Sequence, residues 1–150
     1  MRALIQRVSS AACMVDGQTT GQIDTGLLVL LGITPSDTQE DIDWLAGKIS
    51  RLRIFNDEAG QMNLSVQDVD GRALVISQFT LFASTKKGNR PSYLQAARPE
   101  QAIPFYEAFV KRLAFELRTP VETGIFGADM KISLLNDGPV TIWIDSQNRE

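Results

Sequence analysis

A short segment rich in hydroxyl and amide groups, Ser77-Gln78-Phe79-Thr80, follows an apolar run and is the first candidate for chemistry. Side chains alternate between the two faces of a strand, so Ser77 and Phe79 would share one face and Gln78 and Thr80 the other. One interpretation is a strand end with incidental hydroxyls. The other is a site where regular pairing stops and free backbone N–H groups hold a substrate oxygen, which stabilises an oxyanion without ordering a side chain.

The absence of histidine from the whole chain limits what this segment can do. It excludes Ser-His-Asp and Cys-His catalysis and the usual zinc ligand sets. Thr80 is a candidate nucleophile, but no imidazole is present to activate it, so we favour the backbone donors over the Thr80 hydroxyl. The carboxylates show neither a catalytic pair nor the spacing of metal ligands. The sequence therefore predicts no metal and no cofactor.

A second candidate is the segment Asn136-Asp137-Gly138-Pro139, which lies between two apolar runs at 132–135 and 140–144. These four residue types together predict a turn between two strands. A Gly-Pro bond adopts the cis form at a cost of only about 0.5–1 kcal/mol. A fixed Gly138-Pro139 corner presents backbone carbonyls with little side chain around them. It is either a plain turn or a probe that enters a neighbouring site.

Two further segments allow both a functional and a purely structural interpretation. Lys86, Lys87 and Arg90 lie within five residues, and form either a solvated loop or a phosphate-binding loop. The second segment, 123–130, places Phe126 between two glycines and ends at Met130, a soft and adaptable side chain. It is either the wall of a pocket or a turn whose Phe126 belongs to the core.

Composition places these segments in one ordinary globular domain, residues 1–150, with 43% hydrophobic and 22% charged residues. No apolar run approaches the roughly 20 residues that span a membrane, so no membrane partner is expected. Cys13 is the only cysteine, which excludes an internal disulfide and favours the cytoplasm. The net charge of −3 provides no global attraction to nucleic acid, so any RNA contact must be a local basic patch, and no DNA partner is expected.

The elements that must position these residues alternate between strand-like and helix-like patterns. Asp37 is a candidate helix cap with Glu40 in the capping-box position, and apolar residues recur at helical spacing from there to Leu52. Pro99 suits the first turn of a second helix, which Pro120 ends. Strands are expected at 3–8, 13–15, 18–23, 27–33, 73–82, 130–135 and 140–144. This pattern predicts an α+β fold: a mainly antiparallel, barrel-like β core with two principal helices packed outside.

Taken together, the chain resembles the D-aminoacyl-tRNA deacylase (D-tyrosyl-tRNA(Tyr) deacylase) family nearly from end to end. Two segments match the signature motifs of the family, Ser77-Gln78-Phe79-Thr80 and Asn136–Thr141. Further matching segments lie before, between and after them: Arg7-Val8, Leu52–Phe55, Lys87–Pro91 and Gly124–Met130. The resemblance implies a homodimer that cleaves the ester between a D-amino acid and the 3′ end of tRNA, and that also removes glycine mischarged on tRNA(Ala).

The resemblance also implies roles for individual residues. Gly138-Pro139 would be cis and would reach across the dimer into the pocket of the partner, where its carbonyls exclude L side chains. Backbone N–H groups around Gln78 and Phe79, with Ser77 and Thr80, would hold the ester carbonyl, with or without help from the 2′-hydroxyl of the terminal adenosine.

Further residues would support this site. Phe126, Met130 and Asn136 would line or support the pocket, and the loop with Lys86, Lys87 and Arg90 would contact tRNA. Arg7 would either brace the corner or be an ordinary surface arginine. The alternative function is a small RNA- or ligand-binding module without catalysis, which the lack of histidine favours on composition alone.

Overall fold

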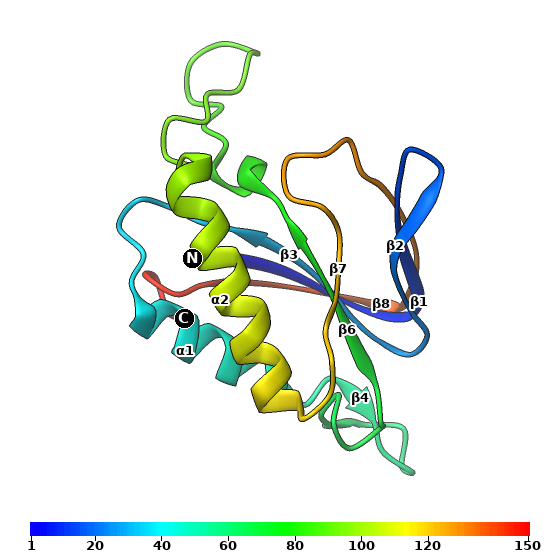
Figure 1. Cartoon of the computed structure of the whole chain (residues 1–150). Coiled ribbons are helices and arrows are strands. Elements are labelled where there is room, and N and C mark those ends of the chain that lie inside the picture. Colours follow the sequence, from blue (N-terminus) through cyan, green and yellow to red (C-terminus); the bar gives the residue numbers. More distant parts are fainter.

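The structure, a computed structural model, describes residues 1–150, and Figure 1 shows two helices lying side by side against one face of a strongly curved sheet. The helices are α1 (Gln39–Ser50) and α2 (Pro99–Leu117). The strands are β1 (Arg2–Val15), β2 (Gln18–Ile23), β3 (Gly26–Gly32), β4 (Phe55–Asn56), β5 (Met62–Leu64), β6 (Arg72–Ser77), β7 (Glu122–Thr123) and β8 (Lys131–Asp145). A single 3-10 turn, η1 (Phe79–Phe82), follows β6.

The sheet runs in the order β2-β1-β3-β6-β7, with β8 also paired to β1. Its two ends curl toward each other and meet at Gly21 of β2. A Cβ added to Gly21 would lie 2.6 Å from the carbonyl oxygen of Thr123 in β7. Only glycine permits this approach, which nearly closes the sheet into a barrel. The predicted α+β, barrel-like core with two outer helices is confirmed. The sheet is mixed, since β3–β6 and β6–β7 pair in parallel.

Two hydrophobic clusters occupy the two faces of this curved sheet. The larger one lies between the sheet and the helices, and includes Leu27, Val29 and Leu31 of β3 together with Phe109 of α2. The smaller one contains Leu28 and other residues on the inner face of the barrel. Successive side chains of a strand point to opposite faces. Strand β3 is therefore buried on both faces, as its continuous apolar sequence predicts.

Helix α1 begins one residue later than its sequence signals indicate. Its N-cap is Thr38, whose backbone N–H donates to the carboxylate of Asp41 at 2.8 Å. The predicted capping box of Asp37 and Glu40 is therefore wrong by one residue, since Thr38 and Asp41 form it instead. The reason is tertiary: Asp37 is fully buried and accepts a hydrogen bond from the amino group of Met1.

Strand β8 corrects the prediction of a turn at 136–139. Both apolar runs belong to one strand, and both pair antiparallel with β1: Ile132–Leu135 with the second half and Thr141–Ile144 with the first. The segment between them bulges outward opposite Arg7, since Gln6 pairs with Thr141 and Val8 with Asn136. Residues that usually reverse the chain here make a bulge instead.

Neither helix combines the length and the apolar character that crossing a membrane requires.

Candidate active site

An apolar cavity of about 300 Å³ lies where β3 and β6 end. Leu31 of β3 pairs in parallel with Ser77 of β6, so the two strands end at the same edge of the sheet. Sites in sheets with parallel strands form at this edge, where the chain leaves regular pairing. The cavity is lined by Leu31, Ile33, Ile76, Ser77, Gln78, Phe79, Ala97, Ala102, Phe126, Gly127, Ala128, Asp129, Met130 and Ile132.

The structure thus brings together two segments that the sequence marked separately. Ser77, Gln78 and Phe79 form one wall, and Phe126 and Met130 form another. A glycine at 124 makes this possible, because a Cβ there would lie 2.4 Å from the sulfur of Met130. Phe126 also packs edge-on against Tyr106 of α2, with ring centroids 6.0 Å apart. Phe126 is therefore half-buried: it packs against Tyr106 and also forms part of the cavity wall.

The backbone at 78–80 differs from the predicted strand. Strand β6 ends at Ser77, and residues 79–82 form η1, so the expected alternation of faces does not hold beyond Ser77. The N–H of Gln78 donates to Leu31 O at 2.7 Å and is not available to a substrate. The first hydrogen bond of η1 runs from Leu81 N–H to Gln78 O. The N–H groups of Phe79 and Thr80 therefore have no partner within the turn.

The side chains of Gln78, Phe79 and Thr80 make different contacts. The amide of Gln78 donates to the hydroxyl oxygen of Thr80. Phe79 is 57% exposed at the mouth of the cavity and packs edge-on against Tyr93, with centroids 5.0 Å apart. The cavity thus combines an apolar interior with a few polar groups, which is the usual character of a small-ligand site.

The Gly138-Pro139 corner lies apart from this cavity and is held by two neighbouring side chains. The peptide bond is cis, and both residues are exposed. Arg7 donates from Nε to Asp137 O at 2.8 Å and from Nη1 to Ile54 O at 2.6 Å. Arg7 is only 6% exposed, which excludes the alternative of an ordinary surface arginine.

Asn136 fixes the corner from the other side. Its amide nitrogen donates to Arg7 O at 3.2 Å and to Val140 O at 3.0 Å, and its oxygen accepts from Val140 N–H at 3.2 Å. One side chain therefore joins the residues before and after the bulge to β1. The sequence suggested a rigid corner, and these bonds explain how it is held.

The basic loop projects from the molecule near Phe79. Lys86, Lys87 and Arg90 are all exposed and lie between Ser84 and Ser92, which pair across the base of the loop. None of the three cations forms an ion pair with the protein.

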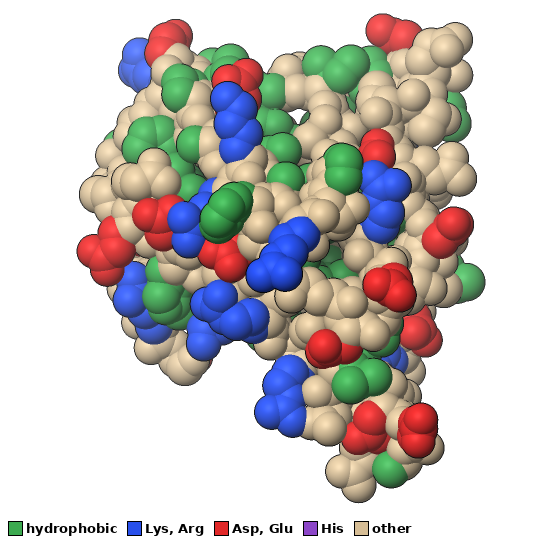
Figure 2. Space-filling view, turned by 60° about the horizontal axis from the view of Figure 1, so that its bottom comes forward, with side chains coloured by type: hydrophobic (Ala, Val, Ile, Leu, Met, Phe, Trp, Pro, Cys, Tyr) green, Lys and Arg blue, Asp and Glu red, His purple; other side chains and the backbone are tan.

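A larger and more polar hollow, about 570 Å³, lies at the opposite end of the molecule, where α1 and α2 end. Figure 2 brings this end forward and shows Lys and Arg side chains interspersed with Asp and Glu. Arg51 pairs with Glu116, and Arg72 with Glu122. Because the lining of this hollow is polar and open, and several of its charges are already paired, we regard the smaller, apolar cavity as the better candidate site.

The sequence missed several residues of the cavity. Leu31, Ile33, Ala97 and Ala102 were recognisable only as core or loop residues. They reach the site through the parallel β3–β6 pairing and the position of α2, and a single sequence carries no signal for either. Asp129, within the segment 123–130 that the sequence marked, is exposed and pairs with Lys131 at 2.9 Å.

Comparison with known proteins agrees with this fold. A D-aminoacyl-tRNA deacylase of Flavobacterium johnsoniae is 66% identical, and one of Chromobacterium violaceum is 61% identical, each over 100% of both chains. The solved structure of a c-Myc DNA Unwinding Element Binding Protein is 41% identical, covers 97% of this chain and 98% of its own, and has a TM-score of 0.91. The structure of a probable eukaryotic D-amino acid tRNA deacylase, 15% identical over 95% and 97%, shares the fold with a TM-score of 0.81.

These matches define an enzyme of the hydrolase class. The family model described as D-Tyr-tRNA(Tyr) deacylase matches residues 4–145, and the chain belongs to this family. The family resemblance seen in the sequence is thereby confirmed.

Proposed function

We propose that this protein hydrolyses the ester bond of D-aminoacyl-tRNA, and of glycyl-tRNA mischarged on tRNA(Ala), releasing the free amino acid and tRNA. The observation that carries the proposal is the cavity in which Ser77–Phe79 meets Phe126 and Met130, in a chain that belongs to a deacylase family. We further propose a cytoplasmic location, because the one cysteine, Cys13, is buried and unpaired.

The proposed reaction uses backbone groups in place of a histidine. Water attacks the ester carbonyl, and the N–H groups of Phe79 and Thr80 stabilise the oxyanion that forms. The bond from the carbonyl carbon to the ribose oxygen then breaks, and that oxygen takes up a proton. The neighbouring 2′-hydroxyl of the terminal adenosine assists the proton transfer. An aminoacyl ester is already activated, so positioning and oxyanion stabilisation suffice.

The proposed selectivity comes from a clash. The Gly138-Pro139 corner of a second copy enters the cavity, and its carbonyls face the α-carbon and amino group of the substrate. An L side chain then meets the corner, whereas a D side chain points away. Backbone atoms exclude every L side chain alike, and exclusion discriminates better than attraction in a small pocket. The exposure of the corner and its distance from the cavity of its own chain support this arrangement.

A homodimer follows from the same proposal, and strand β8 supports it. Only β1 pairs with β8, so one edge of this fifteen-residue strand is open. The strand also exposes Leu135, at 62%, and Trp143, at 48%. A long open edge with exposed apolar side chains is usual at an interface and hazardous elsewhere.

The basic loop is the proposed contact for the 3′ end of tRNA. Its cations, Lys86, Lys87 and Arg90, are free to bind phosphates. The aromatic pair of Phe79 and Tyr93 lies at the mouth of the cavity and offers stacking surfaces to unpaired bases. Cations beside exposed aromatics are the usual composition of a site for single-stranded nucleic acid.

The test is to incubate the purified protein with D-Tyr-tRNA, L-Tyr-tRNA and Gly-tRNA(Ala) and to follow the loss of each ester. We expect rapid loss of the first and third and a background rate for the second. Equal loss of D and L esters would contradict the Gly-Pro filter.

The same assay decides the alternative of a non-catalytic binding module. One relative of known structure is named as a binding protein for a DNA element, which gives a reason to weigh this alternative. If no ester is lost faster than in buffer while the protein still retains tRNA on a filter, the binding module replaces the enzyme.

A further inference from the structure

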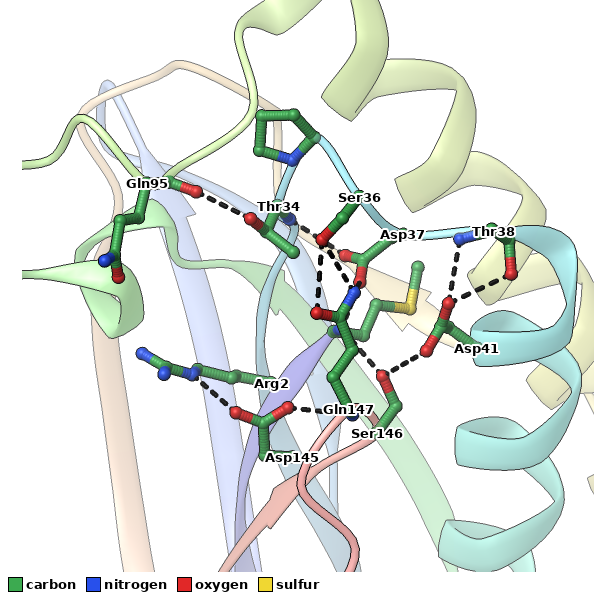
Figure 3. A network of polar contacts seen from close by, with 12 residues as sticks. Arg2, Thr34, Ser36, Asp37, Thr38, Asp41, Gln95, Asp145, Ser146 and Gln147 are labelled. Atoms are coloured by element: carbon green, nitrogen blue, oxygen red, sulfur yellow. Dashed lines mark hydrogen bonds and ion pairs between the residues drawn. The ribbon is translucent and has the colours of Figure 1, made fainter.

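Arg2 connects the edge strand β8 to the turn η1, and nothing in the sequence marks it as functional. Its Nε donates to Asp145 Oδ2 at 2.9 Å, as Figure 3 shows, and its Nη1 donates to the carbonyl oxygen of Leu81 at 2.9 Å. The guanidinium carbon lies 4.4 Å from the ring centroid of Phe82 and 5.5 Å from that of Trp143. One side chain therefore contacts the last two residues of η1 and two residues of β8.

The turn η1 is also supported by strand β3. It packs on Gly32, where an added Cβ would lie 3.0 Å from Gln78 O and 3.1 Å from both Leu81 Cβ and the ring of Phe82. Gly32 is also the antiparallel partner of Arg2. The turn thus rests on a glycine of β3 and is held by the arginine beside it. Moving Leu81 or Phe82 would move the Phe79 and Thr80 N–H groups, because all four residues belong to one turn.

The chemistry of this contact requires arginine. A guanidinium can donate to a carboxylate and a carbonyl in one plane while its faces lie against aromatic rings, whereas the ammonium of lysine is a point charge without that geometry. Arg2 is part-buried, with 28% of its side chain exposed, so its charge-assisted hydrogen bonds are stronger than those of a fully solvated arginine.

We propose that Arg2 is a positioning residue for catalysis: through Leu81 O and Phe82 it holds η1 so that the Phe79 and Thr80 N–H groups face the reacting carbonyl. It also ties this turn to Asp145 and Trp143 of β8, the strand whose Gly-Pro corner is proposed to enter the cavity of the second copy. This inference rests on the proposed deacylase function.

The test compares Arg2→Lys and Arg2→Ala with a matched control, Arg149→Ala. Arg149 also stacks on a tryptophan, Trp44, at 4.4 Å, and pairs with Glu40 at 3.3 Å, but it does not contact η1. Single-turnover and steady-state deacylation of D-Tyr-tRNA give kcat and KM, and circular dichroism reports the fold. Loss of one oxyanion donor typically lowers kcat about 100-fold, so partial misplacement by Arg2→Lys should lower it about 10-fold.

We expect KM to stay within about threefold for Arg2→Lys, because the donors act on charge that develops only in the transition state. Arg149→Ala should stay within about twofold of the wild type in both constants, since surface changes are usually small. Added methylguanidinium should partly restore kcat to Arg2→Ala but not to Arg2→Lys, whose side chain still occupies the site.

Three outcomes separate the possibilities. A wild-type protein that cleaves no ester refutes the proposed function, whatever the variants do. An active wild type with Arg2→Lys as active as Arg149→Ala overturns the role of Arg2. An Arg2→Lys variant whose losses appear in KM and thermal stability alone also overturns it, because that pattern describes a purely structural residue.

Discussion

At the scale of single residues, the proposed chemistry depends on main-chain atoms near Thr80 more than on its hydroxyl. The Thr80 oxygen already accepts a hydrogen bond from the amide of Gln78, and no imidazole can activate it. We expect Thr80→Ala to retain deacylation of D-Tyr-tRNA within about tenfold, well short of the roughly million-fold loss seen when a true nucleophile is removed. Single-turnover rates measure this. Near-complete loss in a folded variant would identify Thr80 as the nucleophile.

Asn136 provides the corresponding test for the corner. Asn136→Ala removes its bonds to Arg7 O, Val140 O and Val140 N–H, so the bulge is held to β1 by fewer contacts, chiefly the bond from Arg7 to Asp137 O. We expect hydrolysis of L-Tyr-tRNA to rise while hydrolysis of D-Tyr-tRNA changes less, because a loosened corner excludes less well. The ratio of the two rates measures this effect. Asn148→Ala, near the exposed chain end, is the control, and an unchanged ratio in Asn136→Ala would contradict the bracing role.

At the scale of elements, α2 is tied to the sheet by one buried hydrogen bond. The hydroxyl of Tyr106 donates to Val75 O of β6 at 2.8 Å, and burial raises the pKa of Tyr106 well above its ordinary value. Tyr106→Phe keeps the ring against Phe126 and removes only this bond. We expect a loss of about 0.5–1.5 kcal/mol in the free energy of unfolding, measured by urea denaturation. Tyr93→Phe, at an exposed ring, should change it by less than about 0.5 kcal/mol.

Local patterns predicted most of these elements, and tertiary contacts account for the rest. Helices α1 and α2, the apolar run of β3 and the strands expected at 13–15 and 18–23 were predictable, since each pattern depends on neighbouring residues. The strand expected to run through Phe79 instead ends at Ser77, and residues 136–139 form a bulge instead of a turn. Both depend on pairing with strands distant in sequence, which no local pattern encodes.

The candidate site was predictable only in part for the same reason. Ser77–Thr80 and 124–130 carried recognisable residue types, whereas their meeting in one cavity depends on the parallel β3–β6 pairing. The sequence left two roles possible for Arg7, and only its burial in the structure distinguishes them. Arg2 had no signal, because its partners Leu81 and Asp145 are distant in the sequence.

At the scale of the whole molecule, stability should fall on acidification. Hydrogen bonds from the backbone N–H groups of Gln61 and Ser65 lower the pKa of Asp57 and Asp68 respectively. At Asp41, burial raises the pKa, but hydrogen bonds from Ser146 and Thr38 outweigh it, so the pKa is lowered. A lowered folded-state pKa gives stability that is present above the unfolded value, about 3.9, and is lost as the pH falls through the folded value.

Asp37 opposes this trend. Burial raises the pKa of Asp37, so its contribution is present at low pH and is lost as the pH rises through the folded value. Three carboxyls therefore favour a loss of stability on acidification, and one opposes it. We expect the free energy of unfolding to decrease between about pH 5 and pH 3, and Asp41→Asn to flatten that slope. An Asp41→Asn variant with the same slope as the wild type would contradict the assignment.

Assembly is the other property at this scale. If the open edge of β8 forms the proposed homodimer, a charge at Leu135 should separate the copies, because desolvating an unpaired charge in an interface costs several kcal/mol. We expect Leu135→Lys to sediment as a monomer at concentrations where the wild type is a dimer, and to lose D-over-L selectivity. Glu150→Lys, at the exposed end of the chain, is the control. A wild type that is monomeric at every concentration would refute the cross-subunit corner.

The buried amino group of Met1 provides a built-in chemical probe for opening of the folded state. Its nitrogen donates to Asp37 and, at 2.7 Å, to Ser146 Oγ, while its side chain is fully enclosed in the larger core cluster. An amine-selective acylating reagent can reach this nitrogen only when the residues around Met1 move away from Asp37 and Ser146. The rate of acylation at Met1, followed by mass spectrometry, would therefore measure how often the chain opens at the start of β1, without any introduced label.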